Sequence, residues 1–258
     1  MGQITGKQRI AKAMRHGIPD RVPLMCQLAL GHYFLNTDLK PHEIWFTSEG
    51  FAEALVTLQQ RYHFDGILIN LPGRAAHWDK DITSITEDES GEVVKWVNGD
   101  VTRIPWNDNP NHFPAKSSLT FPKFETFDPV KDFNRIDDWV MFPFNVYGTP
   151  LLSDKSPGLL DEIPGYFLNT IKMVQQKVSE EISVQGEVFS PFSLYLNLFE
   201  YQEALLNLIA DPGKVVAILS LLTEAAIQWG VIQAKCGVDA IVISSPFAGS
   251  GFISKKMY

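Results

Sequence analysis

The chain has 258 residues, of which 45% are hydrophobic and 20% charged, and a formal net charge of −8 at pH 7. These ordinary proportions exclude disordered and fibrous proteins. The acidic balance also argues against a nucleic-acid partner, since phosphate backbones need a basic surface. Apolar runs such as residues 215–222 are shorter than a membrane span, and the first seven residues lack a hydrophobic signal core. Two cysteines, Cys26 and Cys236, indicate no disulfide framework, so we expect a cytoplasmic protein with no membrane partner.

The first seventy residues alternate between helical and strand patterns. Apolar residues at helical spacing predict helices over residues 4–16 and 41–63. Each helix is followed by a short apolar run without polar alternation, at residues 22–27 and 66–70, which is typical of a parallel strand covered on both faces.

The middle of the chain reads differently. Short alternating segments within residues 81–104 are separated by Glu89-Ser90-Gly91 and by Asn98-Gly99, and Asn-Gly favours a tight hairpin loop. We therefore predict a β-hairpin insertion over residues 81–104. Residues 105–164 are rich in proline, asparagine and phenylalanine, which predicts a long covering loop with at most a short helix around residues 135–140.

Regular patterns return after this loop. We predict a helix over residues 166–180, a strand over 182–188, helices over 198–210 and 211–236, and a strand over 240–244. Asp211 before Pro212, and Gly237 at the other end, are typical helix boundaries. Alternating strands and helices predict an α/β fold with a parallel sheet of at least four strands.

Two groups of motifs, in order along almost the whole chain, resemble the uroporphyrinogen decarboxylase superfamily. The first group is Arg9-Ile10-Ala11-Lys12-Ala13-Met14 with Pro19-Asp20-Arg21-Val22-Pro23, and the second is Gly237-Val238-Asp239-Ala240-Ile241-Val242-Ile243 with Ala248-Gly249 and Ile253-Ser254. Phe64-Asp65-Gly66-Ile67, Ser190-Pro191-Phe192 and Asp211-Pro212 support them. The resemblance implies a TIM (β/α)8-barrel. Since four strands do not close such a barrel, we expect one barrel-type domain over residues 1–258 that is incomplete at its C-terminal end.

The chain departs from the true decarboxylases of this family. Their first strand leads into a segment with two substrate-binding arginines, and here residues 26–32 contain neither. Their catalytic aspartate follows the second strand, where this chain has Asn70. A porphyrinogen with many carboxylates needs several cationic partners, and this region offers chiefly Arg74. The resemblance therefore favours the branch of corrinoid-dependent methyltransferases.

The methyltransferase branch implies two cofactors, zinc and a corrinoid. Many members bind zinc through a His-x-Cys pair and a later cysteine, and none of the six histidines here lies two residues from a cysteine. We expect no cofactor bound firmly within this chain, and zinc only if a further C-terminal part supplies ligands. A corrinoid (cobalamin) carried by a partner protein is the implied cofactor.

Candidate site residues follow the predicted strands, because this fold carries its chemistry at their C-terminal ends. His77 and Glu187 are the candidate catalytic residues, since a buried glutamate can serve as a general acid or base. Each candidate also has a structural interpretation: a buried cysteine, a histidine at a helix edge, a salt-bridged arginine or glutamate. The expected substrate-binding residues are Cys26, Gln27, His32, Asn70, Arg74, Gln185, Ser244 and Ser245.

Three functions stay open from the sequence. The leading one is a methyltransferase that moves a methyl group between a small molecule and a corrinoid protein or thiol. The second is a decarboxylase, or another lyase, acting on a porphyrinogen or a smaller acid held by Arg74, and the third is a catalytically silent homologue. Unpaired strand edges in a half-barrel would favour a homo-oligomer.

Overall fold

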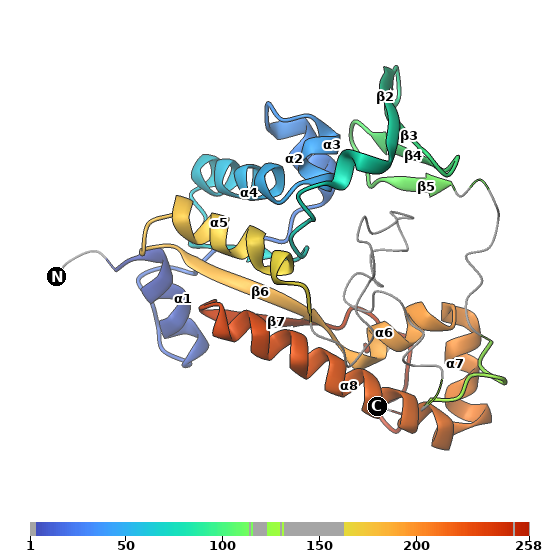
Figure 1. Cartoon of the computed structure of the whole chain (residues 1–258). Coiled ribbons are helices and arrows are strands. Elements are labelled where there is room, and N and C mark those ends of the chain that lie inside the picture. Colours follow the sequence, from blue (N-terminus) through green and yellow to red (C-terminus); the bar gives the residue numbers. More distant parts are fainter. Residues whose placement is uncertain are drawn as a thin grey trace.

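The computed structural model describes residues 4–113, 115, 123–129, 131, 163–249 and 251–257, and within them it has two β-sheets (Figure 1). A parallel sheet has the order β1-β6-β7, formed by β1 (Gly66–Ile69), β6 (Ser183–Phe189) and β7 (Ala240–Ser244). An antiparallel sheet has the order β2-β3-β4-β5, formed by β2 (Ile82–Asp88), β3 (Gly91–Trp96), β4 (Val101–Pro105) and β5 (Asn111–Phe113). The predicted α/β class with a parallel sheet is confirmed.

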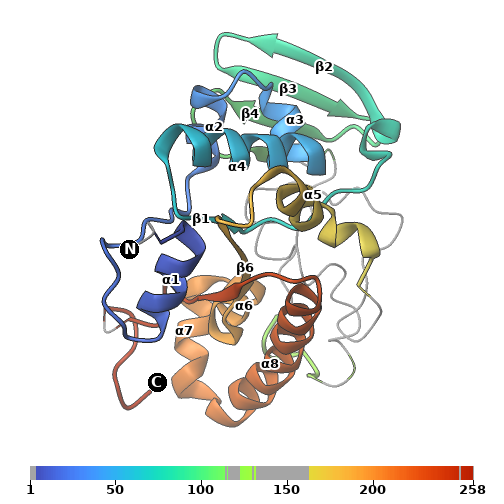
Figure 2. The same cartoon turned by 90° about the vertical axis from the view of Figure 1, so that its left-hand side faces the viewer.

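Helices cover the parallel sheet, and most lie where the apolar spacing predicts them. In Figures 1 and 2, α4 and α5 lie above the sheet beside β1, and α8 lies below it along β6 and β7. The predicted helix over residues 41–63 is divided at Thr47, whose side chain caps the second piece. The helices are α1 (Gly6–Met14), α2 (Leu30–Asn36), α3 (Pro41–Phe46), α4 (Ser48–Tyr62), α5 (Asn169–Lys177), α6 (Pro191–Leu198), α7 (Tyr201–Ala210) and α8 (Pro212–Lys235), with short 3-10 turns η1 (Trp78–Asp81) and η4 (Gly165–Leu168).

The predicted strand at residues 22–27 is wrong, so the described parallel sheet has three strands instead of four. This run is irregular, and its backbone meets β1 only around Leu24, whose carbonyl accepts a hydrogen bond from the Asp65 N–H. Pro23 has no N–H to donate, and Val22 and Leu24 are exposed instead of buried. An apolar run alone does not make a strand without a neighbour to pair with. The closed barrel therefore stays a prediction.

A buried ionic network fixes the run before β1 to helix α1. The Asp65 carboxylate accepts hydrogen bonds from Arg9 Nη1 at 2.5 Å, from both terminal nitrogens of Arg21 at 2.7 and 2.8 Å, and from the Leu24 N–H at 2.8 Å. Arg9 also donates to Asp20. Burial would raise the pKa of Asp65, but the Leu24 N–H and the two guanidiniums lower it below its ordinary value. The charged carboxylate thus joins three segments.

The antiparallel sheet confirms the predicted hairpin at Asn98-Gly99, with a different loop length. Lys95 pairs with Val101, and residues 97–100 form a four-residue connection in which Gly99 has a φ of +90°. The two-residue loop occurs instead at residues 89–90, between Asp88 and Gly91. Strand β5 and helices α2 and α6 were not predicted. Most of the predicted covering loop, including its expected helix near residues 135–140, lies outside the described residues.

A hydrogen-bonded chain of side chains crosses this sheet. Trp96 Nε1–H donates to the Thr102 hydroxyl at 2.9 Å, Thr102 Oγ1 lies 2.9 Å from His112 Nδ1, and His112 Nε2 lies 3.1 Å from Asp100. Thr102 is fully buried, and burial lowers the pKa of His112 despite the nearby Asp100 carboxylate. A neutral His112 that accepts from Thr102 and donates to Asp100 satisfies every one of these groups. These hydrogen bonds therefore fix β5 to β4.

We expect Thr102→Val to lower the free energy of unfolding by about 1–3 kcal/mol, because it leaves the buried Trp96 N–H without an acceptor. Valine has nearly the same shape, so little packing is lost. Urea denaturation at neutral pH measures the change. Thr86→Val, at an exposed position of β2, is the control and should change stability little. Equal effects of the two variants would contradict the assigned network.

Helix α8 bears on the expectation that no apolar run of the chain is long enough to span a membrane. Among the described residues it is long and apolar enough, by length and composition alone, to cross a membrane. In the structure one side of it, including Ile218, Leu222 and Trp229, is buried, and α8 packs against β6 and β7. Core helices of soluble proteins meet the same criteria of length and composition, so this is weak evidence for a membrane span.

Candidate functional site

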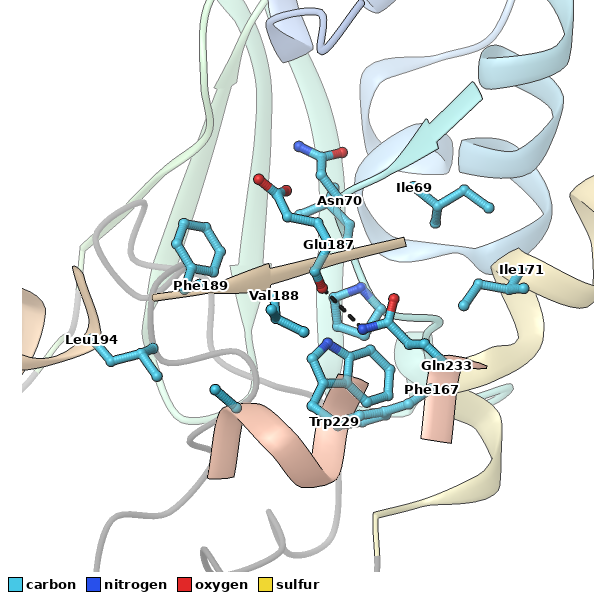
Figure 3. A pocket seen from close by; sticks show the side chains of 13 residues that line it. Ile69, Asn70, Phe167, Ile171, Glu187, Val188, Phe189, Leu194, Trp229 and Gln233 are labelled. Carbon is cyan, nitrogen blue, oxygen red and sulfur yellow. Dashed lines mark hydrogen bonds between the residues drawn. The ribbon is translucent and has the colours of Figure 1, made fainter. Parts of the chain in front are cut away.

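Strand β6 places a carboxyl group in the interior of the protein. Successive side chains of a strand point to opposite faces, so Gln185 and Glu187 share the face opposite Val184 and Val188. Because Ile69 of β1 pairs with Gly186, Asn70 comes level with Glu187 at the next position. Figure 3 shows the side chains of Asn70 and Glu187 rising together on the same side of β6.

Helix α8 supports this strand from the other face. Gln233 Nε2 donates to the Glu187 carbonyl oxygen at 2.9 Å, the contact drawn in Figure 3. Gly186 makes this possible, since a Cβ there would lie 2.0 Å from Gln233 Oε1. Both Gln233 and Glu187 are buried, with exposed fractions of 1% and 4%. The backbone that carries the carboxyl group is therefore fixed from behind.

The Glu187 carboxyl group itself has no hydrogen-bond partner of ordinary geometry among the described residues, although both of its oxygens are buried. Burial raises its pKa from 4.5 to about 7, and the nearby Ser244 hydroxyl opposes this only in part. Glu187 is one of the residues that line a small cavity of about 20 Å³, together with Trp229 and Gln233 of α8. Glu187 is thus a buried carboxyl that changes its charge near neutral pH, as catalytic and binding carboxyls often do.

A larger cavity of about 470 Å³ adjoins the first and shares Asn70, Leu71 and Phe189 with it. Its volume is in the range of small-molecule sites, and it lies at the C-terminal ends of β1, β6 and β7. No Lys, Arg, His, Asp or Glu is among its described lining residues. Those residues are Gln27, Leu28, Ala29, Leu30, Tyr33, Trp45, Phe51, Asn70, Leu71, Asn109, Phe189, Ser193, Asn197, Tyr201, Ser244, Pro246 and Phe247.

Part of the predicted site is brought together here. Gln27, Asn70 and Ser244 line the larger cavity, and Glu187 lines the smaller one beside it. These residues could be predicted because parallel strands place their C-terminal ends at the same edge of the sheet, where the cavity lies.

The other predicted residues lie elsewhere. The exposed His77 precedes η1, and neither it nor Arg74 lines either cavity; Arg74 Nε donates to the Trp45 carbonyl, and its guanidinium lies 5.0 Å from the Trp45 ring. His32 bonds to Tyr62 at the edge of α2. Three predicted residues remain. The Gln185 amide donates a hydrogen bond to the Ser183 hydroxyl, and the Ser245 hydroxyl accepts one from Ser190. Cys26 is exposed.

Several lining residues were missed because their elements were missed. Tyr33 comes from α2, and Ser193 and Asn197 come from α6. The spacing of apolar residues in the sequence did not predict these two helices. Asn109 comes from the connection between β4 and β5, which packs so closely on α2 that a Cβ at Gly31 would lie 2.0 Å from the Asn107 carbonyl oxygen. Two further lining residues, Tyr201 and Phe247, contact each other edge to face, with their ring centroids 4.7 Å apart. Their aromatic side chains were the signal in the sequence that could have marked this part of the cavity.

The described residues do not fit a resident metal ion. No three His, Cys, Asp or Glu side chains among them lie close enough to share one. The two cysteines are also far from a ligand set, since Cys26 is exposed near α2 and Cys236 ends α8. No zinc role is assigned to this part of the chain.

Residues 152–258 match the family model described as "Uroporphyrinogen decarboxylase (URO-D)". A solved structure, a methyltransferase from Methanosarcina mazei, superposes with a TM-score of 0.61 at 15% sequence identity. The superposition covers 98% of this chain and 63% of that one, so this chain spans less than two thirds of its length. Likeness at this identity shows a shared fold. No curated protein matches the sequence.

Proposed function

We propose that the chain belongs to the uroporphyrinogen decarboxylase superfamily, whose family model matches residues 152–258, and that it acts as a methyltransferase. It would move a methyl group between a small molecule, bound in the 470 Å³ cavity, and a corrinoid protein or thiol. The fold that it shares with a methyltransferase supports this proposal. So does the position of the cavity at the strand ends where a TIM barrel, the proposed complete fold, carries its chemistry.

One observation favours this function over decarboxylation of a porphyrinogen. The described lining of the cavity contains no lysine, arginine or histidine, whereas a substrate with several carboxylates needs cationic partners to leave water. Arg74, the residue that a smaller acid would need, lies on the Trp45 ring and outside the cavity lining. A neutral or cationic methyl compound suits the amide, hydroxyl and aromatic groups that are present.

Glu187 supplies the acid–base chemistry in this proposal. When a methyl group leaves, the bond to the donor atom breaks and its electron pair stays on that atom, so the charge there falls by one unit. A buried carboxyl with a pKa of about 7 compensates in the same enclosed space, either by taking up a proton from water or by giving its own proton to the donor atom. Asn70, Gln27 and Ser244 would hold the polar atoms of the small molecule while this happens.

The corrinoid would stay on its partner protein. A cavity of about 470 Å³ holds a small molecule and is too small for a corrinoid ring, so this chain's residues fit the methylated molecule only. When bound at the mouth of the cavity, the corrinoid would supply the methyl-accepting centre. The residues of this chain would orient the small molecule, exclude water and balance charge.

Methyl transfer to free cob(I)alamin tests the proposal. The purified chain is mixed with cob(I)alamin and ¹³C-methyl donors of three kinds, a quaternary ammonium, an alcohol and an aromatic ether, and transfer is followed by absorbance and ¹³C NMR. We expect one donor class to react faster than in the absence of protein. Glu187→Gln should slow this reaction roughly 100-fold or more, the usual scale of acid–base catalysis. Glu224→Gln, on the exposed side of α8, should leave it unchanged.

Two results would contradict the proposed methyltransferase. No transfer from any donor above the protein-free rate would contradict the methyltransferase and favour a catalytically silent homologue. Release of CO2 from uroporphyrinogen or a smaller acid would favour a lyase.

A further inference from the structure

We propose that the cavity beside Glu187 binds a small organic cation, a methylated ammonium compound, with the Glu187 carboxylate as its counter-ion. This names the substrate class of the proposed methyltransferase and so rests on that function for its chemical use. The binding itself follows from the residues of the two adjoining cavities, and from Asn70 and Ser244, which line the larger cavity and lie beside the Glu187 side chain.

The charges around the two cavities favour a cation. Among the described residues that line the two cavities, Glu187 is the only one with a carboxyl, amino, guanidinium or imidazole group. Tyr33, the buried phenol of the lining, has a pKa raised by burial and stays neutral. A carboxylate 4% exposed without a partner is costly, and a bound cation removes that cost. An anionic ligand would instead meet like charge.

The aromatic lining of the larger cavity also favours a cation. Six aromatic residues line the larger cavity, and one of them, Phe189, also lines the Glu187 cavity. Aromatic rings attract a cation that is poorly hydrated, as quaternary ammonium groups are. The Tyr201–Phe247 pair lies edge to face, and Tyr33 meets Phe51 in the same way at 5.8 Å, so the rings are fixed. The six residues are Tyr33, Trp45, Phe51, Phe189, Tyr201 and Phe247.

A methylated ammonium compound also suits the proposed methyl transfer. In a methylated ammonium donor the C–N bond breaks, the electron pair stays on nitrogen, and the methyl group goes to the acceptor, so a neutral amine is left. The cation that neutralised Glu187 is then lost, and the carboxylate takes a proton from water as its pKa returns to about 7. Product formation thus weakens the contact that held the substrate, which favours release.

Isothermal titration calorimetry with choline tests the inference, and 3,3-dimethyl-1-butanol is the control ligand because it has the same shape without the charge. We expect choline to bind roughly tenfold or more tightly than the alcohol, on the scale of a desolvated cation–π contact and an ion pair. Choline affinity should rise with pH through about 7, as Glu187 ionises, while the affinity for the alcohol should stay constant.

Matched variants complete the test. Glu187→Gln should reduce choline affinity roughly tenfold or more and abolish its pH dependence, whereas Glu224→Gln should change neither. Equal binding of choline and the alcohol, no binding of choline, or a pH-independent choline affinity in the unmodified chain would each overturn the inference. These results need no variant that might misfold. Choline binding without any methyl transfer would contradict the proposed function alone, and transfer from neutral donors without choline binding would contradict this inference alone.

Discussion

Asp65→Ala should lower the free energy of unfolding by about 3–5 kcal/mol, because the buried Arg9 guanidinium loses one of its two carboxylate partners. Arg9 is 4% exposed and keeps only its contacts to Asp20 and the Ile4 carbonyl once the Asp65 carboxylate is gone. The Leu24 N–H and the Arg21 guanidinium lose an acceptor at the same time. For a chain of this size the loss corresponds to a fall in Tm of roughly 10 °C.

Thermal denaturation followed by circular dichroism measures this effect, with Asp79→Ala, an exposed aspartate in η1, as the control. The control should change Tm little, as exposed charges contribute little. If Asp65→Ala matched the control, the network would not be what joins α1, residues 22–24 and β1.

Glu187→Gln should have the opposite effect on stability, and only at high pH. The pKa of Glu187 is raised from 4.5 to about 7 by burial, so between these values the folded chain binds more protons than the unfolded chain. Stability from this group is therefore complete below about pH 4.5, falls as the pH rises to about 7, and stays low above it. The loss is roughly 3 kcal/mol, at 1.36 kcal/mol for each pKa unit.

The glutamine variant removes this loss. Urea denaturation should find it more stable than the unmodified chain at pH 8 by up to about 3 kcal/mol and similar at pH 5, while its methyl transfer is slower. A stabilising substitution that removes activity is the signature of a group kept for function. A variant less stable at both pH values would instead assign Glu187 to packing.

The sequence predicted the fold where a strand is buried on both faces. Residues 66–70 and 182–188 contain β1 and most of β6, whose side chains are covered by α4, α5 and α8, whereas residues 240–244 form the edge strand β7, which packs on α8 and leaves Ile243 exposed. Residues 22–27 carry the same apolar signal but no backbone partner along their length. Hydrogen-bond pairing depends on the whole fold, so no local pattern could distinguish this run from the true strands.

The site was predictable where a polar residue interrupts an apolar strand. Glu187 stood out because a charged residue in a buried strand needs a reason, and the structure adds that its carboxyl group has no hydrogen-bond partner of ordinary geometry among the described residues. Arg74 looked equally suitable by position, but Trp45, distant in sequence, lies beneath its guanidinium. Tyr33 and Asn197 come from helices with no strong periodic signal, so tertiary packing alone brings them to the cavity.

Glu187 should titrate near neutral pH, as a buried carboxyl beside a cation-binding cavity. ¹³C NMR of the chain labelled at glutamate side-chain carboxyls measures this directly, with the Glu187 signal assigned by its absence in Glu187→Gln. We expect a pKa of about 7 in the free chain, and a value lower by roughly one unit or more with saturating choline. A pKa near 4.5 in the free chain, or a value near 7 that choline does not lower, would contradict it.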